Sequence, residues 1–406
     1  MKPAARAFST ALTAVALSMA MATGAFAQTE NILHTFTGGA DGGNPNSSLI
    51  LDGKGNLYGT TSGGGTSQNC TGCGTVFEFA RGSNGTWTQN VLYNSGSMSN
   101  FADGLGPQGR LTFDSKGNLY GTTVGGGSSF QGTVFELSPG SNGTWTETVL
   151  YNFTGGSNGA NPFNGVVLDS TGNLYGTASG GASGFGLIFE LVAGTNGTLT
   201  YKILYNFTGN NDGAYPYGTL LFDQAGNIYG VCPQGGTHDY GLVFRLTAGS
   251  NGKWKEKVLH VFPGGSAGSN PIGGLVWDSA GNLFGVASYI AYELSSSNGT
   301  WTEKTLHSFG GGSDGASPQA ALAIDKAGNL YGMTYSGGAH RGTVYELSPS
   351  SNGKWSEKIL HNFAGDGVDG VFPSGAAVAI DSSGNIFGTT VQGGASKFGV
   401  LFEIVP

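Results

Sequence analysis

The chain has 406 residues, of which 76 are glycine, 38% are hydrophobic and only 10% are charged, and its formal net charge is −8. A glycine content this high without a three-residue period excludes collagen, and the apolar content is too high for a disordered chain. The negative charge, with no basic stripe, excludes nucleic acid as a partner and disfavours an anionic membrane surface.

The first 27 residues predict an export signal that is removed from the mature protein. Lys2 and Arg6 supply the positive start, residues 11–22 form an apolar run, and residues 25–27 (AFA) have the small residues of a cleavage site. The run is too short to span a bilayer, and no stretch of about 20 apolar residues follows it. We therefore expect a mature chain that begins near Gln28, is secreted or periplasmic and does not insert into a membrane.

One motif, Asp-x-x-Gly-Asn-[Leu/Ile]-[Tyr/Phe]-Gly, recurs along the rest of the chain at intervals of roughly 47 to 62 residues. Its seven copies begin at Asp52, Asp114, Asp169, Asp223, Asp278, Asp325 and Asp381. A single repeat of this length cannot bury its own apolar face, so the repeats must stack in an array.

Each repeat predicts four short antiparallel strands, here called a to d from the channel outward. In the third repeat these are residues 165–169, 173–178, 186–191 and 199–207, which are β-branched and aromatic runs bounded by Gly, Asn and Asp. The repeated Asp-x-x-Gly-Asn segment predicts a tight a–b turn. Asn-Gly pairs predict the c–d hairpins. These pairs are Asn84-Gly85, Asn142-Gly143, Asn196-Gly197, Asn251-Gly252, Asn298-Gly299 and Asn352-Gly353.

The two ends of the mature chain predict how the array closes. Residues 31–36 match the end of strand d in other repeats, such as residues 359–363, whereas the chain finishes with residues 400–404, which match strand c. The last repeat therefore takes its fourth strand from the N-terminus, which removes the exposed sheet edges. We predict an all-β fold, a seven-bladed β-propeller of four antiparallel strands per blade, formed as a single domain by residues 28–406.

Two segments carry a family resemblance: residues 117–127 (GNLYGTTVGGG) and 132–137 (GTVFEL). They resemble the exported bacterial glycine-rich "GloVer" tandem-repeat (choice-of-anchor) proteins, and the resemblance extends over essentially the whole mature chain. It implies export and a propeller-like repeat fold, without an assigned activity. This chain departs from that family in showing no anchor.

The sequence has three cysteines, which the expected export would place in an oxidising compartment. Cys70 and Cys73 are spaced C-x-x-C in a glycine-rich loop and predict a small loop-closing disulfide, whereas Cys232 stands alone. A zinc site would need a second ligand pair, which the sequence does not offer at suitable spacing.

The d–a connections carry a second repeated motif, [Asp/Asn]-Gly-x-x-Pro, with Asn158 and Ala267 in place of Asp in two blades. Its acidic members are Asp41, Asp103, Asp212, Asp314 and Asp369. One hypothesis is a ring of carboxylates near the channel that binds calcium. The alternative, which repetition favours, is that each Asp caps a turn before Pro.

The b–c loops vary most and provide the candidate ligand site. The loop of blade five is very short, and its neighbours carry the irregular histidines, whereas His34, His260, His307 and His361 share one register position in strand d and are expected to be structural. One hypothesis is a notch at the rim, with aromatic and polar groups suited to a carbohydrate or another small polar ligand. Its residues are His238, Asp239, Tyr240, Tyr289, Tyr335, His340 and Arg341. The alternative is that these residues are solvated loop tips.

The function expected from the sequence is that of a non-enzymatic binding or scaffold module, with a polysaccharide or a cell-surface protein as partner. No catalytic residue and no cofactor is predicted, apart from the calcium alternative, and the chain is expected to be a monomer. The alternative is a carbohydrate-active hydrolase or lyase that uses the notch at blade five. A third hypothesis is a structural repeat protein whose regular surface mediates assembly.

Overall fold

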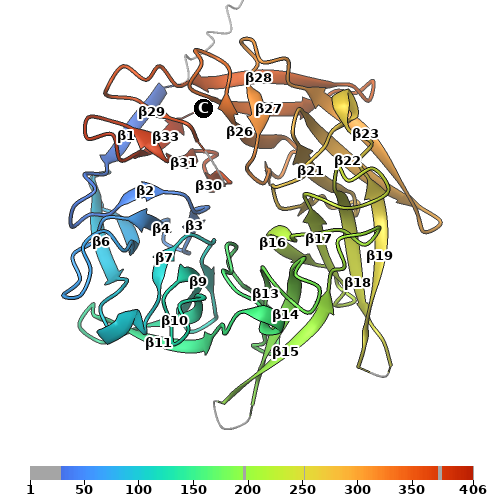
Figure 1. Ribbon diagram of the computed structural model, residues 1–406. Coiled ribbons are helices and arrows are strands. Elements are labelled where there is room, and N and C mark those ends of the chain that lie inside the picture. The colour runs from blue at the N-terminus through green and yellow to red at the C-terminus, as the bar shows by residue number, and fades with distance from the viewer. Residues whose placement is uncertain (1–28, 195–197, 251, 374–376, 406) are drawn as a thin grey trace, which may run out of the picture.

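The computed structural model describes residues 29–194, 198–250, 252–373 and 377–405. The predicted export signal, the Asn196-Gly197 pair and Asn251 lie outside the described residues. The described chain forms seven antiparallel sheets arranged as blades around a central axis (Figure 1). The predicted seven-bladed β-propeller is therefore confirmed. No helix in the described part of the chain is long and apolar enough to cross a membrane.

The first three blades follow one another in chain order. Blade one contains β2 (Gly43–Pro45), β3 (Ile50–Leu51), β4 (Leu57–Gly63), β5 (Thr75–Arg81) and β6 (Trp87–Asn94). Blade two contains β7 (Leu105–Pro107), β8 (Thr112–Phe113), β9 (Leu119–Gly125), β10 (Thr133–Pro139) and β11 (Trp145–Asn152). Blade three contains β12 (Val167–Leu168), β13 (Leu174–Ala178), β14 (Leu187–Ala193) and β15 (Leu199–Asn206).

The next three blades repeat this order. Blade four contains β16 (Tyr217–Phe222), β17 (Ile228–Cys232), β18 (Leu242–Ala248) and β19 (Trp254–Val261). Blade five contains β20 (Val276–Trp277), β21 (Leu283–Ala287), β22 (Ile290–Ser297) and β23 (Thr300–Ser308). Blade six contains β24 (Ala316–Pro318), β25 (Ala323–Ile324), β26 (Leu330–Ser336), β27 (Thr343–Pro349) and β28 (Trp355–Asn362). Short 3₁₀ turns, η1 (Ser99–Phe101), η2 (Gly156–Asn158) and η3 (Gly265–Ala267), lie in the connections between blades.

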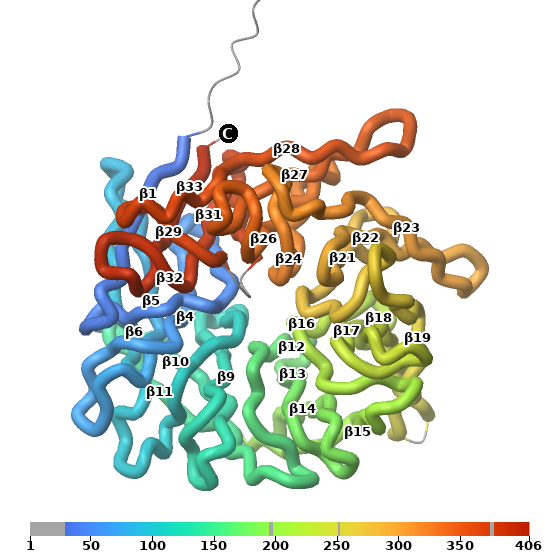
Figure 2. Tube along the Cα trace, turned by 45° about the horizontal axis from the view of Figure 1, so that its top comes forward, coloured from blue at the N-terminus to red at the C-terminus, as the bar shows by residue number. Residues whose placement is uncertain are grey.

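Blade seven joins the two ends of the chain. Its sheet has the order β1 (Thr29–Thr35), β33 (Val400–Val405), β31 (Ile386–Thr390) and β30 (Ala379–Ile380), and β29 (Gly370–Val371) pairs with β32 (Gln392–Gly393) beside it. β1 pairs antiparallel with β33, from Thr29 opposite Val405 to Thr35 opposite Val400 (Figure 2). The predicted closure by the N-terminal strand is therefore present.

The a–b turns show why the Asp-x-x-Gly-Asn motif recurs. In blade one the Asp52 Oδ1 accepts hydrogen bonds from the backbone N–H groups of Lys54 at 2.8 Å and Asn56 at 2.9 Å. Gly55 between them has φ +86°, a left-handed conformation that glycine adopts without a Cβ penalty. The same pair of bonds forms in all seven turns, so every blade begins with the same rigid corner.

The apolar core lies between neighbouring blades. At the closing joint Phe36, at the end of β1, is fully buried and packs against Phe77 of blade one, with ring centroids 5.5 Å apart. The same cluster includes Phe387 of blade seven. Phe153, Phe207, Phe262 and Phe363 are buried at the corresponding ends of other outer strands. Each blade therefore depends on its neighbours for burial, and the ring is stable only when complete.

Deleting residues 31–36 from the mature chain should destabilise the entire ring, because blade seven loses its outer strand and Phe36 leaves the joint with blade one. We expect one cooperative unfolding transition at a lower temperature, measured by circular dichroism, and partial recovery when a peptide of residues 29–36 is added. An unchanged melting curve would contradict the closure.

Candidate functional site

The channel along the axis is lined by one equivalent residue from each blade, which directly precedes the first buried Leu or Val of the inner strand. In blade order these residues are Ser48, Arg110, Gly165, Thr219, Gly274, Ala321 and Ala377. Six of the seven are small, which keeps the axis open. Arg110 is the exception to the repeat, and it places a long cationic side chain where every other blade has at most a hydroxyl or a methyl group.

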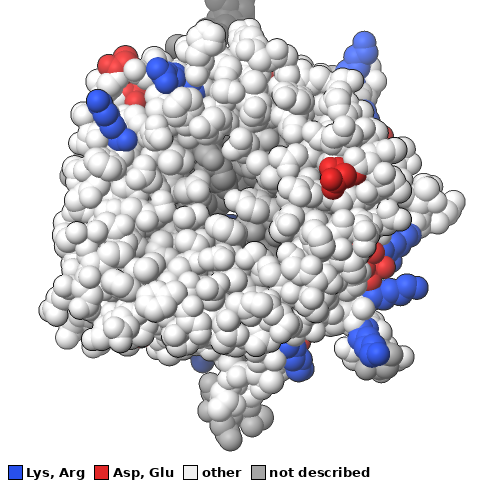
Figure 3. Space-filling view, in the orientation of Figure 1, with Lys and Arg blue, Asp and Glu red and all other residues white. Residues whose placement is uncertain are grey.

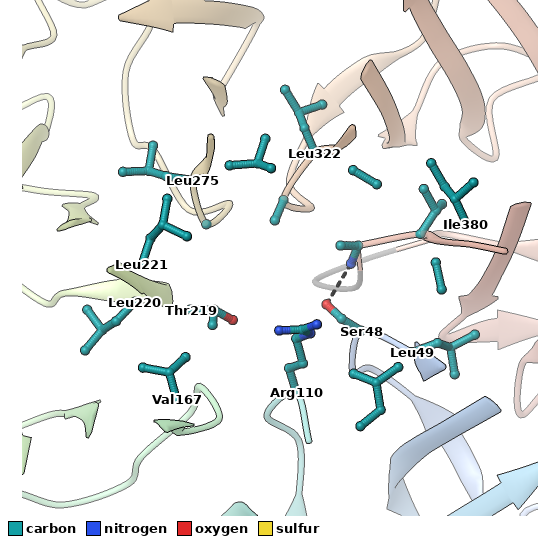
Figure 4. Close-up of a pocket in the computed structure, with 18 of the residues that line it drawn as sticks. Ser48, Leu49, Arg110, Val167, Thr219, Leu220, Leu221, Leu275, Leu322 and Ile380 are labelled. Carbon is teal, nitrogen blue, oxygen red and sulfur yellow. Dashed lines mark hydrogen bonds between the residues drawn. The ribbon is translucent and has the colours of Figure 1, made fainter. Parts of the chain in front are cut away.

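The channel has two sections that meet at Arg110. The wider section is a cavity of about 540 Å³ with largely aliphatic walls, in which Leu221, Leu275 and Ile380 are examples (Figure 4). The narrower section, about 40 Å³, lies at the ends of the d–a connections and is lined by polar groups such as Asn46 and Gln108. Figure 3 shows a hollow at the centre of one face, and most of the charged side chains visible on that face lie toward its edge.

The Arg110 side chain points into the centre of the channel, between Ser48 and Thr219 (Figure 4). Its guanidinium makes no hydrogen bond or ion pair with any of the described residues, and the residues that line the two cavities include no carboxylate among them. The side chain is open to water in the channel, yet protein surrounds it, and this partial burial lowers the pKa of the guanidinium. Since an arginine stays protonated in proteins, the channel contains an uncompensated positive charge.

The backbone holds Arg110 tightly. A Cβ added to Gly165 of the next blade would come within 1.8 Å of the Arg110 carbonyl oxygen. The backbone segments of blades two and three are therefore in direct contact beside the channel. In blade one, next to the blade of Arg110, the Ser48 hydroxyl accepts a hydrogen bond from the backbone N–H of Ala377 in blade seven at 2.8 Å. Arg110 therefore projects from a fixed backbone, and the neighbouring wall formed by blades one and seven is also held in place.

The structure places the predicted notch residues on three separate b–c loops, except Tyr335, which lies within β26. His238, Asp239 and Tyr240 lie between β17 and β18, Tyr289 lies between β21 and β22, and all four are exposed. The described residues form no hydrogen bond, ion pair or ring contact that joins the three loops. The small cavity beside Tyr289 is lined by Asn270, Ile272, Ser288 and residues 317–319, and by none of the other notch residues.

The notch residues of blades four and six make contacts toward the following blade instead. The Tyr240 ring lies against Gly264, where a Cβ would come within 2.5 Å of its Cδ2 atom. Tyr335 stacks on Phe372 with ring centroids 5.0 Å apart, and the Arg341 guanidinium lies 5.5 Å from the centroid of the same ring. His340 lies in the same loop as Arg341 and is exposed. The structure thus brings Tyr335 and Arg341 together on the Phe372 ring, and among the described residues neither contacts the other two loops.

The five acidic d–a residues are distributed around the ring, one to an interface between blades, and none lines the channel cavities. Each accepts a backbone N–H of its own turn, as Asp103 does from Ser97 at 2.7 Å. The others receive the N–H of Thr37, Thr208, Gly310 and Ala364 on Asp41, Asp212, Asp314 and Asp369. Each Asp therefore caps its own turn, which is the alternative that the sequence favoured because the motif is repeated.

Each of these aspartates also contacts the His or Tyr of the outer strand in the preceding blade. The contacts are His34–Asp41 at 3.0 Å, Tyr93–Asp103 at 2.7 Å, Tyr205–Asp212 at 3.1 Å, His307–Asp314 at 3.7 Å and His361–Asp369 at 3.1 Å. His260, in the blade whose loop carries Ala267, has no partner for its buried Nε2 among the described residues, and burial lowers the pKa of its imidazole. The strand-d histidines therefore belong to contacts between blades, as expected for structural residues.

Two interfaces contain residues that could hold a metal ion. Glu30, His361 and Asp369 form one group and His307, Asp314 and Glu357 form the other, each with ligand atoms within 4.8 Å of one another. A mixed imidazole and carboxylate set suits zinc better than calcium, which prefers oxygen ligands. The calcium hypothesis for these aspartates stays a prediction.

Each interface also contains a residue from the outer strand of the following blade. This residue is Glu in five blades, Gln89 in blade one and Tyr201 in blade three. Glu147 lies at the Tyr93–Asp103 interface, is 8% exposed, and has no hydrogen-bond partner for either carboxylate oxygen among the described residues. Burial first, and then the nearby Asp103 carboxylate, raise the pKa of Glu147 to about 8. Glu256 beside Asp212 is raised to about 7 for the same reasons. Near neutral pH such a carboxyl retains its proton more readily than an exposed glutamate does.

Two of the three cysteines form a disulfide and the third is a free thiol. Cys70 and Cys73 form a disulfide in the b–c loop of blade one, next to Gly96 of the following connection. Cys232 is buried at the end of β17, and burial raises the pKa of its thiol well above the usual value.

The blades, the closing strand and the axial channel define this protein as a closed β-propeller with a central cavity. The Gloeobacter/Verrucomicrobia repeat matches residues 18–177, 143–293 and 290–406. The chain belongs to that repeat family, which confirms the resemblance seen in the sequence. No curated protein matches the chain.

Two solved structures share the fold. One is the extracellular domain of a candidate one-component system from B. thetaiotaomicron, with a TM-score of 0.50, 12% identity and coverage of 93% of this chain. This chain spans 40% of that protein's chain. The other is a candidate 6-phosphogluconolactonase from Bacteroides uniformis, with a TM-score of 0.50, 14% identity, and coverage of 84% of this chain and 87% of that one. At these identities the similarity concerns the fold alone.

The stability of the ring should fall as the pH rises through about 8. The pKa of Glu147 is about 8 when folded and 4.5 in the unfolded reference, so the folded state retains a proton that the unfolded state releases. The contribution is complete below about pH 4.5 and is lost as the pH rises through the folded value. Glu147→Gln, which keeps the neutral form, should flatten the dependence of the melting temperature on pH between 5 and 9.

The chain offers a matched control for this measurement, because Gln89 occupies the equivalent position in blade one and donates to the Asp41 carbonyl at 2.8 Å. Gln89→Glu should make the loss of stability at high pH steeper. Equal slopes for the wild type and the Glu147→Gln variant would show that Glu147 is already ionised in the folded state.

Proposed function

We propose that this protein is an exported, non-enzymatic binding module, and that its ligand is an organic anion with an apolar body held in the axial channel. The observation that carries the proposal is the Arg110 guanidinium, which projects into the cavity without a carboxylate partner among the described residues. The propeller fold and the family support a module of this kind.

The chemistry of the two channel sections selects the ligand. A guanidinium in a confined cavity favours a carboxylate, because the two can form parallel N–H···O bonds. The aliphatic walls around Leu221, Leu275 and Leu322 would cover the rest of the molecule, and burying apolar area there contributes about 25 cal/mol per Å². An apolar pocket with one fixed polar group is the usual form of a small-molecule site.

Export to the cell exterior or periplasm is part of the proposal. It is supported by the N-terminal sequence and is compatible with the disulfide between Cys70 and Cys73. The hydrolase or lyase alternative would need an acid–base pair at the ligand. The channel-lining residues among those described supply a cation and no carboxylate, which supports binding over catalysis.

The test is calorimetric titration of the mature chain with decanoate and with the uncharged decanol. Decanoate should bind more tightly than decanol, and Arg110→Met should weaken decanoate at least tenfold, which is about 1.4 kcal/mol, while leaving decanol unchanged. Arg341→Met makes the same change on an exposed loop and serves as the control. Equal binding of decanoate by wild type and Arg110→Met, or no binding of either probe, would count against the channel site.

A further inference from the structure

A second cavity lies outside the channel, at the a–b turns of blades four and five. It has a volume of about 590 Å³ and a mainly apolar wall that includes Tyr229, Trp277 and Trp301, with Asp223 and Asp278 beside them. The sequence suggests little specialisation on this side of the ring, because its turns are nearly identical. One departure from the repeat, Trp277, lies in the wall of this cavity. A second, Phe284, packs against Trp355 of blade six and bears on the cavity only through Asp278, the turn aspartate of its own blade, which lines it.

The first departure is Trp277, which directly precedes the turn aspartate of blade five. The equivalent residues in the other blades are Leu51, Phe113, Leu168, Phe222, Ile324 and Ile380, so an indole occurs at this position only in blade five. Its Nε1–H donates to the Phe222 carbonyl at 3.1 Å, which fixes the ring. Trp301 lies 6.4 Å away, centroid to centroid, and both indoles are only partly buried. The corner therefore presents two orientated aromatic surfaces to solvent.

The second departure is Phe284, which replaces the Tyr of the repeated motif. In five blades that Tyr hydroxyl lies 3.1 to 3.4 Å from the Oδ2 of the turn aspartate. Blade five lacks this donor, and the Asp278 Oδ2 accepts one bond only, from the Asn282 side chain at 2.8 Å. Blade seven also has a Phe, Phe387, but there Arg81 lies 3.8 Å from the Asp381 Oδ2. Among the described turns, Asp278 alone keeps an acceptor without a substitute partner.

We propose that this corner, defined by Trp277, Trp301 and Asp278, binds a saccharide. A sugar ring has apolar C–H faces that pack on aromatic rings and hydroxyl donors that a carboxylate oxygen accepts, so it matches both departures together. The two nearby carboxylates disfavour an anionic ligand. The site is separate from the channel, and the inference does not depend on Arg110. It assigns to the a–b side the polysaccharide partner that the sequence placed at the b–c notch.

The measurement is depletion of the mature chain by insoluble cellulose, chitin and xylan, with soluble glucan and xylan fragments titrated by calorimetry. Wild type should be depleted by at least one of these polymers. Trp277→Leu, which installs the residue of blades one and three, should weaken binding at least tenfold. Phe284→Tyr restores the donor of the other blades to Asp278 and should also weaken binding, although it removes no group from the cleft.

Two controls separate this site from stability and from the channel. Trp145→Leu changes a Trp at the register of Trp301 in blade two, where blade three has Leu199, and should bind like the wild type. Arg110→Met should also bind like the wild type. Melting curves confirm that each variant is folded. The proposal is overturned if no polysaccharide depletes the wild type, if Trp277→Leu and Phe284→Tyr bind unchanged, or if tetramethylammonium binds at the corner and the sugars do not.

Discussion

The pairing of β1 with β33 is the interaction on which the rest of the structure depends. Every blade buries its apolar residues against two neighbours, so a ring with one blade open would expose a sheet edge and one face of the core. The strand that prevents this comes from the opposite end of the chain. Closure also creates the axial channel, because seven inner strands enclose a shared space only when the last blade is in place.

Repetition makes the departures from the repeat informative. A residue type that recurs from blade to blade is explained by the fold alone. Examples are the turn aspartate of all seven blades and the buried Phe that follows six of the seven outer strands. Arg110 in the channel and Trp277 with Phe284 at the corner of blade five are not required by the fold. Each alters the chemistry beside a cavity: Arg110 is a cation without a carboxylate partner among the described residues, and Asp278 lacks the Tyr donor that five other turns have.

The interfaces between blades combine packing with protonation. His or Tyr from one blade, Asp from the connection and Glu from the next blade meet at the outer edge, and the buried carboxyls of Glu147 and Glu256 retain protons that they would lose in water. This arrangement links ring stability to pH through several similar sites. It also explains why the repeated aspartates are held in their turns and do not converge on the channel.

The sequence alone determined the strand order, the blade number and the closing strand, because turns and periodicity are local properties and the two chain ends match missing pieces of one blade. It also indicated the structural role of the strand-d histidines. It did not reveal the channel site, since Arg110 is unusual only when compared with the residues that the ring places opposite it. Nor did it show that the notch loops make their contacts toward following blades. Which side chains share a cavity depends on the curvature of the closed ring, and only the tertiary structure decided that.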